Sequence, residues 1–191
     1  FSAVAAGPGQ RCPGPGPEQC GMSPFVDMTR ARASWLAVAI VIAAALLRLP
    51  SLGWGLPNPL HPVYSYHPDE AFFVLWADDL YAGETFRKLF MYGGTAFFST
   101  LKASNLAAGW WTGTSPPDML ARVVGARVLS LCATLATLFA VRAAASRLYG
   151  WRTGLVAMTC AALYLGPLAV GQWARPDALF TLLFAVHLAL V

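Results

Sequence analysis

Four apolar blocks limit what this chain can fold into. They cover residues 33–52, 122–146, 154–171 and 177–191. A helix needs about 20 apolar residues to cross a bilayer. The whole chain is 57% hydrophobic and 12% charged, whereas about one quarter of the residues of a soluble domain are charged. We therefore predict an all-α, polytopic bundle of membrane helices, in which residues 177–191 are the start of a fourth span that the chain does not complete.

The first block, from Ala33 to Leu52, has a cleaved signal peptide as its serious alternative, because a basic stretch precedes the apolar one. The only small-x-small pattern for cleavage, Ala43 to Ala45, lies inside the apolar run instead of after it. Further spans follow, so we expect an uncleaved anchor. Arg48 lies close enough to the end of this span for its side chain to reach the interface. Residues 1–27 are rich in Gly and Pro and are predicted to be disordered.

The arginines at the ends of the blocks orient the spans. Arg30 and Arg32 precede the first span, and Arg147 and Arg152 lie in the short turn between the second and the third. Short loops rich in Lys and Arg face the cytoplasm. Segment 53–121 then lies outside, so we predict a multi-pass protein of the plasma membrane with a long extracytoplasmic first loop that contains interfacial helices.

The sequence indicates neither a nucleic-acid partner nor a metal site. The basic residues do not form a stripe with interleaved aromatic residues, which argues against a nucleic-acid partner. Of the four cysteines, Cys12 and Cys20 lie in the tail, and Cys132 and Cys160 lie inside apolar blocks, where we expect them to be buried. No CxxC motif and no Cys/His spacing suits zinc. No metal site is predicted.

The densest polar cluster of the long loop is YSYHPDE, residues 64–70, which the aromatic stretch AFFVLWA follows directly. Pro68 suits a first helical turn, so a helix is expected to begin here, with Asp69 and Glu70 over its positive end. The aromatic face suits a helix that lies in the membrane interface, close to the headgroup plane. At that depth Asp69 can act as a base toward a lipid-anchored substrate. Equally, the two acids can simply complement the helix N-terminus.

Three more charged residues are candidates on the same side. Arg127 lies inside the outer end of the second span, where an arginine needs protein, water or an anionic partner around it. A lipid phosphate is one such partner, and a carboxylate of the loop is another. Arg175 and Asp177 mark the outer start of the fourth block, where Asp177 can serve as an N-terminal cap.

Three segments together resemble a known family: LRLPSLGWG, then YHPDEA, then the stretch from RVLSLCATLATLF to ARPDALF. They are similar to the GT-C glycosyltransferases, in particular to bacterial family 39 enzymes related to dolichyl-phosphate-mannose protein mannosyltransferases and to the aminoarabinose transferase of lipid A. The resemblance covers residues 35–191. It implies transfer of a sugar, with inversion, from a polyprenyl-phosphate donor to a hydroxyl of a protein, lipid or glycan acceptor outside the membrane.

The resemblance also implies roles for individual residues. By position, Asp69 matches the catalytic base, and Glu70 and His67 are expected beside it in the substrate site. Arg127 and Arg175 are expected to stabilise the charge of the leaving phosphate, because arginine offers planar, paired donors.

Asp177 matches an acidic residue at the start of the fourth span of these enzymes, and we place it in the substrate site as well. No cofactor is implied beyond the lipid-linked donor, and the part of a divalent metal is left open. Enzymes of this kind have many more spans, so we expect this chain to be a fragment that is inactive alone. The alternative is a non-enzymatic polytopic membrane protein, a transporter piece or an assembly subunit, in which the same charges only anchor helices.

Overall fold

The computed structural model describes residues 24–61, 68–78, 94–164 and 175–191. Within these ranges the secondary structure is helical, apart from one antiparallel bridge between Asn58 and His61. The helices are α1 (Pro24–Leu52), α2 (Pro68–Asp78), α4 (Gly94–Thr112), α5 (Met119–Tyr149), α6 (Trp151–Leu163) and α8 (Pro176–Leu190). The predicted all-α class is therefore confirmed for the described part of the chain.

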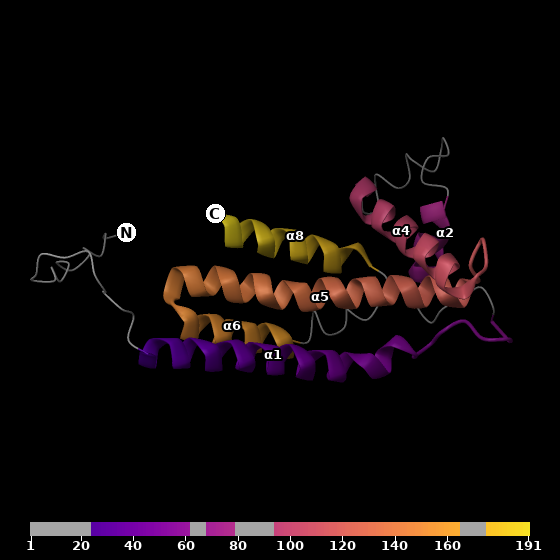
Figure 1. Ribbon diagram of the computed structural model, residues 1–191. Helices are drawn as coiled ribbons and strands as arrows, with labels where there is room; N and C mark the ends of the chain where they lie inside the picture. The colour runs from indigo at the N-terminus through magenta and orange to yellow at the C-terminus, as the bar shows by residue number, and fades with distance from the viewer. Residues whose placement is uncertain (1–23, 62–67, 79–93, 165–174) are drawn as a thin grey trace, which may run out of the picture.

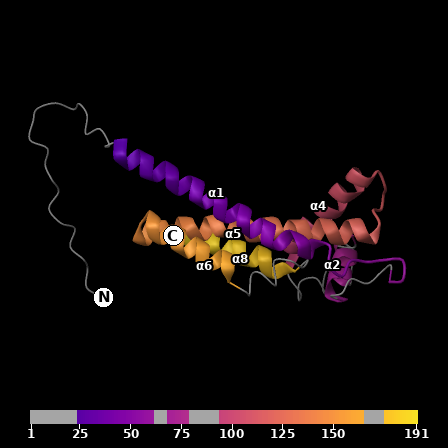
Figure 2. The same ribbon diagram turned by 90° about the horizontal axis from the view of Figure 1, so that it is seen from below.

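Helix α5 is the centre of the bundle, because it packs against α1, α4, α6 and α8. Helices α1 and α6 run in one direction along it, and α5 and α8 run in the other (Figures 1 and 2). The start of α5 is fixed by Asp118, whose side chain accepts a hydrogen bond of 2.7 Å from the backbone N–H of Ala121. Its end is fixed by Gly150 at φ 88°, a region that favours glycine. The chain then turns directly into α6.

Among the described residues, two helices are long and apolar enough to cross a membrane: the 21 residues Arg32–Leu52 of α1 and the 31 residues Met119–Tyr149 of α5. Helix α1 buries one face, whose residues recur at helical spacing: Ala33, Ala37, Ala44 and Arg48. This face packs against Leu138 of α5 and Met158 of α6.

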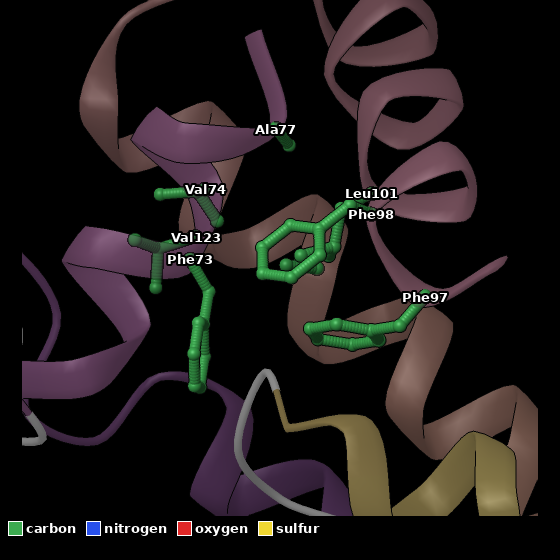
Figure 3. Close-up of a cluster of buried hydrophobic side chains, with 8 residues drawn as sticks. Phe73, Val74, Ala77, Phe97, Phe98, Leu101 and Val123 are labelled. Carbon is green, nitrogen blue, oxygen red and sulfur yellow. The ribbon is translucent and has the colours of Figure 1, made fainter. Parts of the chain in front are cut away.

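Helices α2 and α4 form the head region, at the end of the bundle where α1 ends and α5 and α8 begin (Figure 1). Its core is aromatic, as Figure 3 shows. The ring of Phe73 on α2 meets that of Phe97 on α4 edge to face, with centroids 5.8 Å apart, and Phe98 lies beside both. Val123 of α5 closes this core from below. The aromatic contacts therefore hold α2 firmly on the head end of α5.

The ends of two helices differ from the prediction. Helix α1 begins at Pro24, so residues 24–27 are helical and do not belong to the disordered tail that the sequence predicted, whose residues 1–23 lie outside the described ranges. Helix α5 begins at Met119, three residues before the predicted start at Arg122, because Asp118 caps it.

The predicted helix over residues 154–171 is also interrupted. Helix α6 ends at Leu163, and Tyr164 is extended, with φ −66° and ψ 126°. In a continuous helix the ring of Pro167 would clash with the carbonyl of residue 163, which explains the early end. The prediction that Cys132 and Cys160 are buried was wrong: both lie on exposed faces of their helices.

Arg48 does not reach the interface, as the sequence suggested, but is completely buried. Its Nη1 donates to the carbonyl of Ala44 at 2.9 Å, and its Nη2 donates to the carbonyl of Ala162 at 3.1 Å. Ala162 lies in the last turn of α6, where carbonyls have no helical donor. Arg48 thus satisfies the C-terminal end of α6 and joins it to α1.

Candidate functional site

The acidic pair at the start of α2 is divided between two environments. Asp69 and Glu70 both lie in the first turn of α2, over its positive end. Successive helical positions point about 100° apart, since a turn takes about 3.6 residues. The side chain of Asp69 is 51% exposed, whereas that of Glu70 is 0% exposed. Asp69 is therefore accessible to a reacting partner, and Glu70 is not.

Glu70 forms a bidentate ion pair with Arg127 of α5. Nε of Arg127 donates to Oε1 of Glu70 at 3.0 Å, and Nη2 donates to Oε2 at 2.8 Å. Nη1 of the same guanidinium donates to the carbonyls of Leu52 at 3.0 Å and Trp54 at 2.7 Å, at the end of α1. The Arg127 side chain is 1% exposed. Arg127 therefore fastens α1, α2 and α5 together beneath Asp69.

This pairing corresponds to one of the two partners considered for Arg127, the loop carboxylate. A buried arginine of this kind needs a paired carboxylate, since an uncompensated charge in a low dielectric is costly. Because Glu70 and the α1 carbonyls use most of its donors, Arg127 presents little of its guanidinium to a ligand.

Arg175 brings a third element to the acidic pair. It is the N-cap residue of α8, and its Nη2 lies 3.5 Å from Oδ2 of Asp69, although 105 residues separate the two in the chain. Its side chain is 28% exposed. Asp177 follows in the first turn of α8 and is exposed, so it is not the N-cap that the sequence suggested. The predicted site residue His67 lies outside the described residues.

Four of the predicted residues therefore meet at the head end: Asp69, Glu70, Arg127 and Arg175. Glu70 and Arg127 form the buried ion pair, and Asp69 and Arg175 form a second pair that is accessible to solvent. Across the described ranges, no group of three or more His, Cys, Asp or Glu side chains is arranged to hold a metal ion. The site offers one accessible carboxylate beside one accessible guanidinium, which suits proton removal next to a bound anion.

Sequence reasoning missed a second polar network between α2, α4 and α5. Asp78 at the end of α2 pairs with Nη1 of Arg122, and its Oδ1 accepts a 2.8 Å hydrogen bond from Asn105 of α4. Asn105 also donates to the carbonyl of Val74 at 2.9 Å. Nε of Arg122 donates to the carbonyl of Pro117 at 2.8 Å. This network fixes the far end of α2, as Glu70 fixes its start.

A sequence signal for this network exists. Glu70 and Asp78 are eight residues apart on α2, and Arg122 and Arg127 are five apart on α5. Two acids on one helix and two arginines on another can form two ion pairs when the helices pack together. Here the first acid, Glu70, pairs with the second arginine, Arg127, and Asp78 pairs with Arg122. The sequence of neither helix indicates that the two helices pack together. These ion pairs could therefore be predicted only if the packing of α2 against α5 were already known.

Comparisons with protein-family models, with curated proteins and with solved structures give no match to this chain. The resemblance to GT-C glycosyltransferases therefore stays an expectation from the sequence.

Proposed function

We propose that the chain is a multi-pass membrane protein whose head region lies on the extracytoplasmic face. Arg127 donates to the carbonyl of Leu52, so these residues lie at one depth. From there α1 extends back over 21 residues to Arg32. Along α5 the stretch from Arg127 to Arg147 has the same length. At 1.5 Å per residue this is about 30 Å, the thickness of the hydrocarbon core.

The charges support this orientation. Arg32, Arg147 and Arg152 are exposed at the end opposite the head region, as expected for the cytoplasmic side. The outward faces of the bundle between the two ends carry large apolar side chains, among them Leu46, Leu47, Phe139 and Val156. Such a continuous apolar surface suits contact with lipid.

We propose further that this is part of a GT-C glycosyltransferase that uses a polyprenyl-phosphate sugar. Asp69 removes the proton from the acceptor hydroxyl, and the hydroxyl oxygen forms a bond to the anomeric carbon. The bond between that carbon and the phosphate oxygen breaks, and the lipid phosphate leaves with the electron pair. Attack on the face opposite the leaving group inverts the anomeric centre.

The other charged residues have supporting roles in this proposal. Arg175 faces the leaving phosphate, whose growing charge its planar donors can stabilise. Glu70 and Arg127 are positioning residues that keep the start of α2 fixed. Asp177 is exposed in the first turn of α8, where it can contact the donor or the acceptor. The observation that carries the proposal is the accessible Asp69–Arg175 pair, which lies beside the buried Glu70–Arg127 ion pair at the start of α2.

The test is sugar transfer from a polyprenyl-phosphate donor in membranes that contain the complete product of the gene. We expect Asp69→Asn to lower kcat by about 10²–10⁴-fold, the usual contribution of a general base, with membrane insertion unchanged. Asp118→Asn is the matched control: it makes the same chemical change on an exposed residue of the head end, and Asn caps a helix as well as Asp does. Full activity of Asp69→Asn would end the assignment of Asp69 as the base.

A second candidate, a non-enzymatic membrane subunit, is favoured by one observation. Arg48, Arg122 and Arg127 all donate to groups of the bundle itself, so most of the buried charge serves to join helices. In that case Asp69 and Arg175 only fasten α2 to α8, and Asp69→Asn changes stability slightly and no transfer reaction. The transfer assay therefore separates the two candidates.

A further inference from the structure

A second charged site lies at the end of the bundle opposite the head region. A groove of about 620 Å³ runs between the first turns of α1 and the last turns of α5. Its walls include Ala33 and Ser34 of α1 and Phe139, Arg142, Ala143 and Ser146 of α5. The lining thus combines one arginine and two serines with apolar side chains.

Arg142 is the residue that gives this groove its character. Its side chain is half-buried, and the carboxylates whose side chains the structure describes, Asp69, Glu70, Asp78, Asp118 and Asp177, all lie in or beside the head region. Arg32, Arg147 and Arg152 are exposed around the same end of the bundle. The local charge is therefore strongly positive, and a partly buried cation of this kind favours an anionic partner.

We infer that this groove binds the phosphate of an anionic phospholipid of the cytoplasmic leaflet. The guanidinium of Arg142 offers paired donors to phosphate oxygens, and the hydroxyls of Ser34 and Ser146 are close enough to line the same space. Gly150 and Trp151, between the end of α5 and the start of α6, also line the groove.

The depth of Arg142 and the apolar wall single out a lipid among phosphate-bearing ligands. Arg142 is five residues, or about 7.5 Å, along α5 from Arg147 toward the membrane interior. A soluble phosphate gains nothing from contact with apolar side chains. The glycerol and first acyl carbons of a phospholipid, in contrast, would contact Phe139 and Ala143. Basic pockets between membrane helices on the cytoplasmic side bind anionic headgroups in this way. The inference uses the proposed orientation and is independent of the proposed transferase activity.

The experiment measures lipid retention by native mass spectrometry of the purified chain in detergent. Dioleoyl-phosphatidylglycerol and dioleoyl-phosphatidylcholine are supplied in equal amounts. We expect the parent to retain phosphatidylglycerol preferentially and Arg142→Gln to retain about fivefold less, the effect expected for one arginine near the membrane surface. Arg142→Lys should recover part of the difference. Lys102→Gln is the control, since it removes one positive charge from α4 in the head region, at the other end of the bundle.

A second variant keeps the inference testable if Arg142→Gln fails to insert. Ala143 lines the groove and is exposed, so Ala143→Phe fills the space without changing the charge. It should lower phosphatidylglycerol retention as Arg142→Gln does. Equal retention of both lipids by the parent, or unchanged retention in Ala143→Phe, would overturn the inference. Displacement of the lipid by millimolar inorganic phosphate would also overturn it, because the groove would then recognise free phosphate.

Discussion

Replacement of Arg127 by leucine should destabilise the bundle more than any other single arginine substitution. The change removes the two hydrogen bonds to the carboxylate of Glu70 and leaves that carboxylate fully buried. It also removes the donor for the carbonyls of Leu52 and Trp54. Breaking a buried ion pair from one side costs about 3–5 kcal/mol. Two lost charge-assisted hydrogen bonds at about 1.5–3 kcal/mol each give about 3–6 kcal/mol, a similar range.

The partner substitution should cost less. In Glu70→Gln the guanidinium of Arg127 keeps the carbonyls at the end of α1, and one oxygen of the amide can still accept, so we expect a loss of about 2–3 kcal/mol. The double variant should cost less than the sum of the two, with a coupling free energy of about 1–3 kcal/mol. Only a direct interaction between the two side chains gives such a coupling.

The assay is unfolding of the purified chain in mixed micelles by titration with sodium dodecyl sulfate, followed by far-ultraviolet circular dichroism. Arg152→Leu serves as the control, because Arg152 is exposed and should cost under about 1 kcal/mol. If Arg127→Leu lies within about 1 kcal/mol of the parent, or if the two substitutions are additive, the buried pair does not join the three helices as described.

Three further substitutions test other joints of the fold by the same titration. Arg48→Met should stay within about 1 kcal/mol of the parent, because the buried Arg48 pairs with none of the carboxylates that the structure describes and an apolar side chain can replace it; a loss above about 3 kcal/mol would contradict this. Gly154→Ala should cost about 1–3 kcal/mol, since the new Cβ would lie 2.8 Å from the carbonyl of Arg142 and 1.9 Å from Oγ of Ser146. Adding Ser146→Ala to this variant should restore only part of the lost stability. Asn105→Ala should cost about 1–3 kcal/mol, because it removes two hydrogen bonds to α2; an unchanged midpoint would show that Asn105 does not hold α2.

The long helices α1 and α5 could be predicted from the sequence because apolar runs of this length have few other solutions. Their ends could not, because single residues set them: Asp118 adds a turn to the start of α5, and Gly150 ends it. Pro167 indicates from the sequence that α6 ends early. A prediction that considers only the length of the apolar run does not take this proline into account.

The site was predictable in part for a similar reason. Pro68 and the two acids after it define a helix start, so the position of both acids in the first turn of α2 follows from local chemistry, whereas the exposure of Asp69 and the burial of Glu70 do not. The partners of these acids depend on which helices pack together, which is not a local property. From the sequence, a lipid phosphate and a loop carboxylate fitted the position of Arg127 equally well. Arg48 was expected to reach the membrane interface, but it is buried and donates to α6 instead.

The most direct test of the proposed architecture is the side of the membrane on which each end of the bundle lies. In a background in which the four cysteines are replaced by serine or alanine, single cysteines are placed at Leu60, which is 86% exposed near the head region, and at Leu148, which is 72% exposed at the opposite end. Intact cells are treated with a membrane-impermeant maleimide. We predict that Leu60→Cys reacts at once and that Leu148→Cys reacts only after the membrane is opened. Reaction of both from the same side would contradict the account.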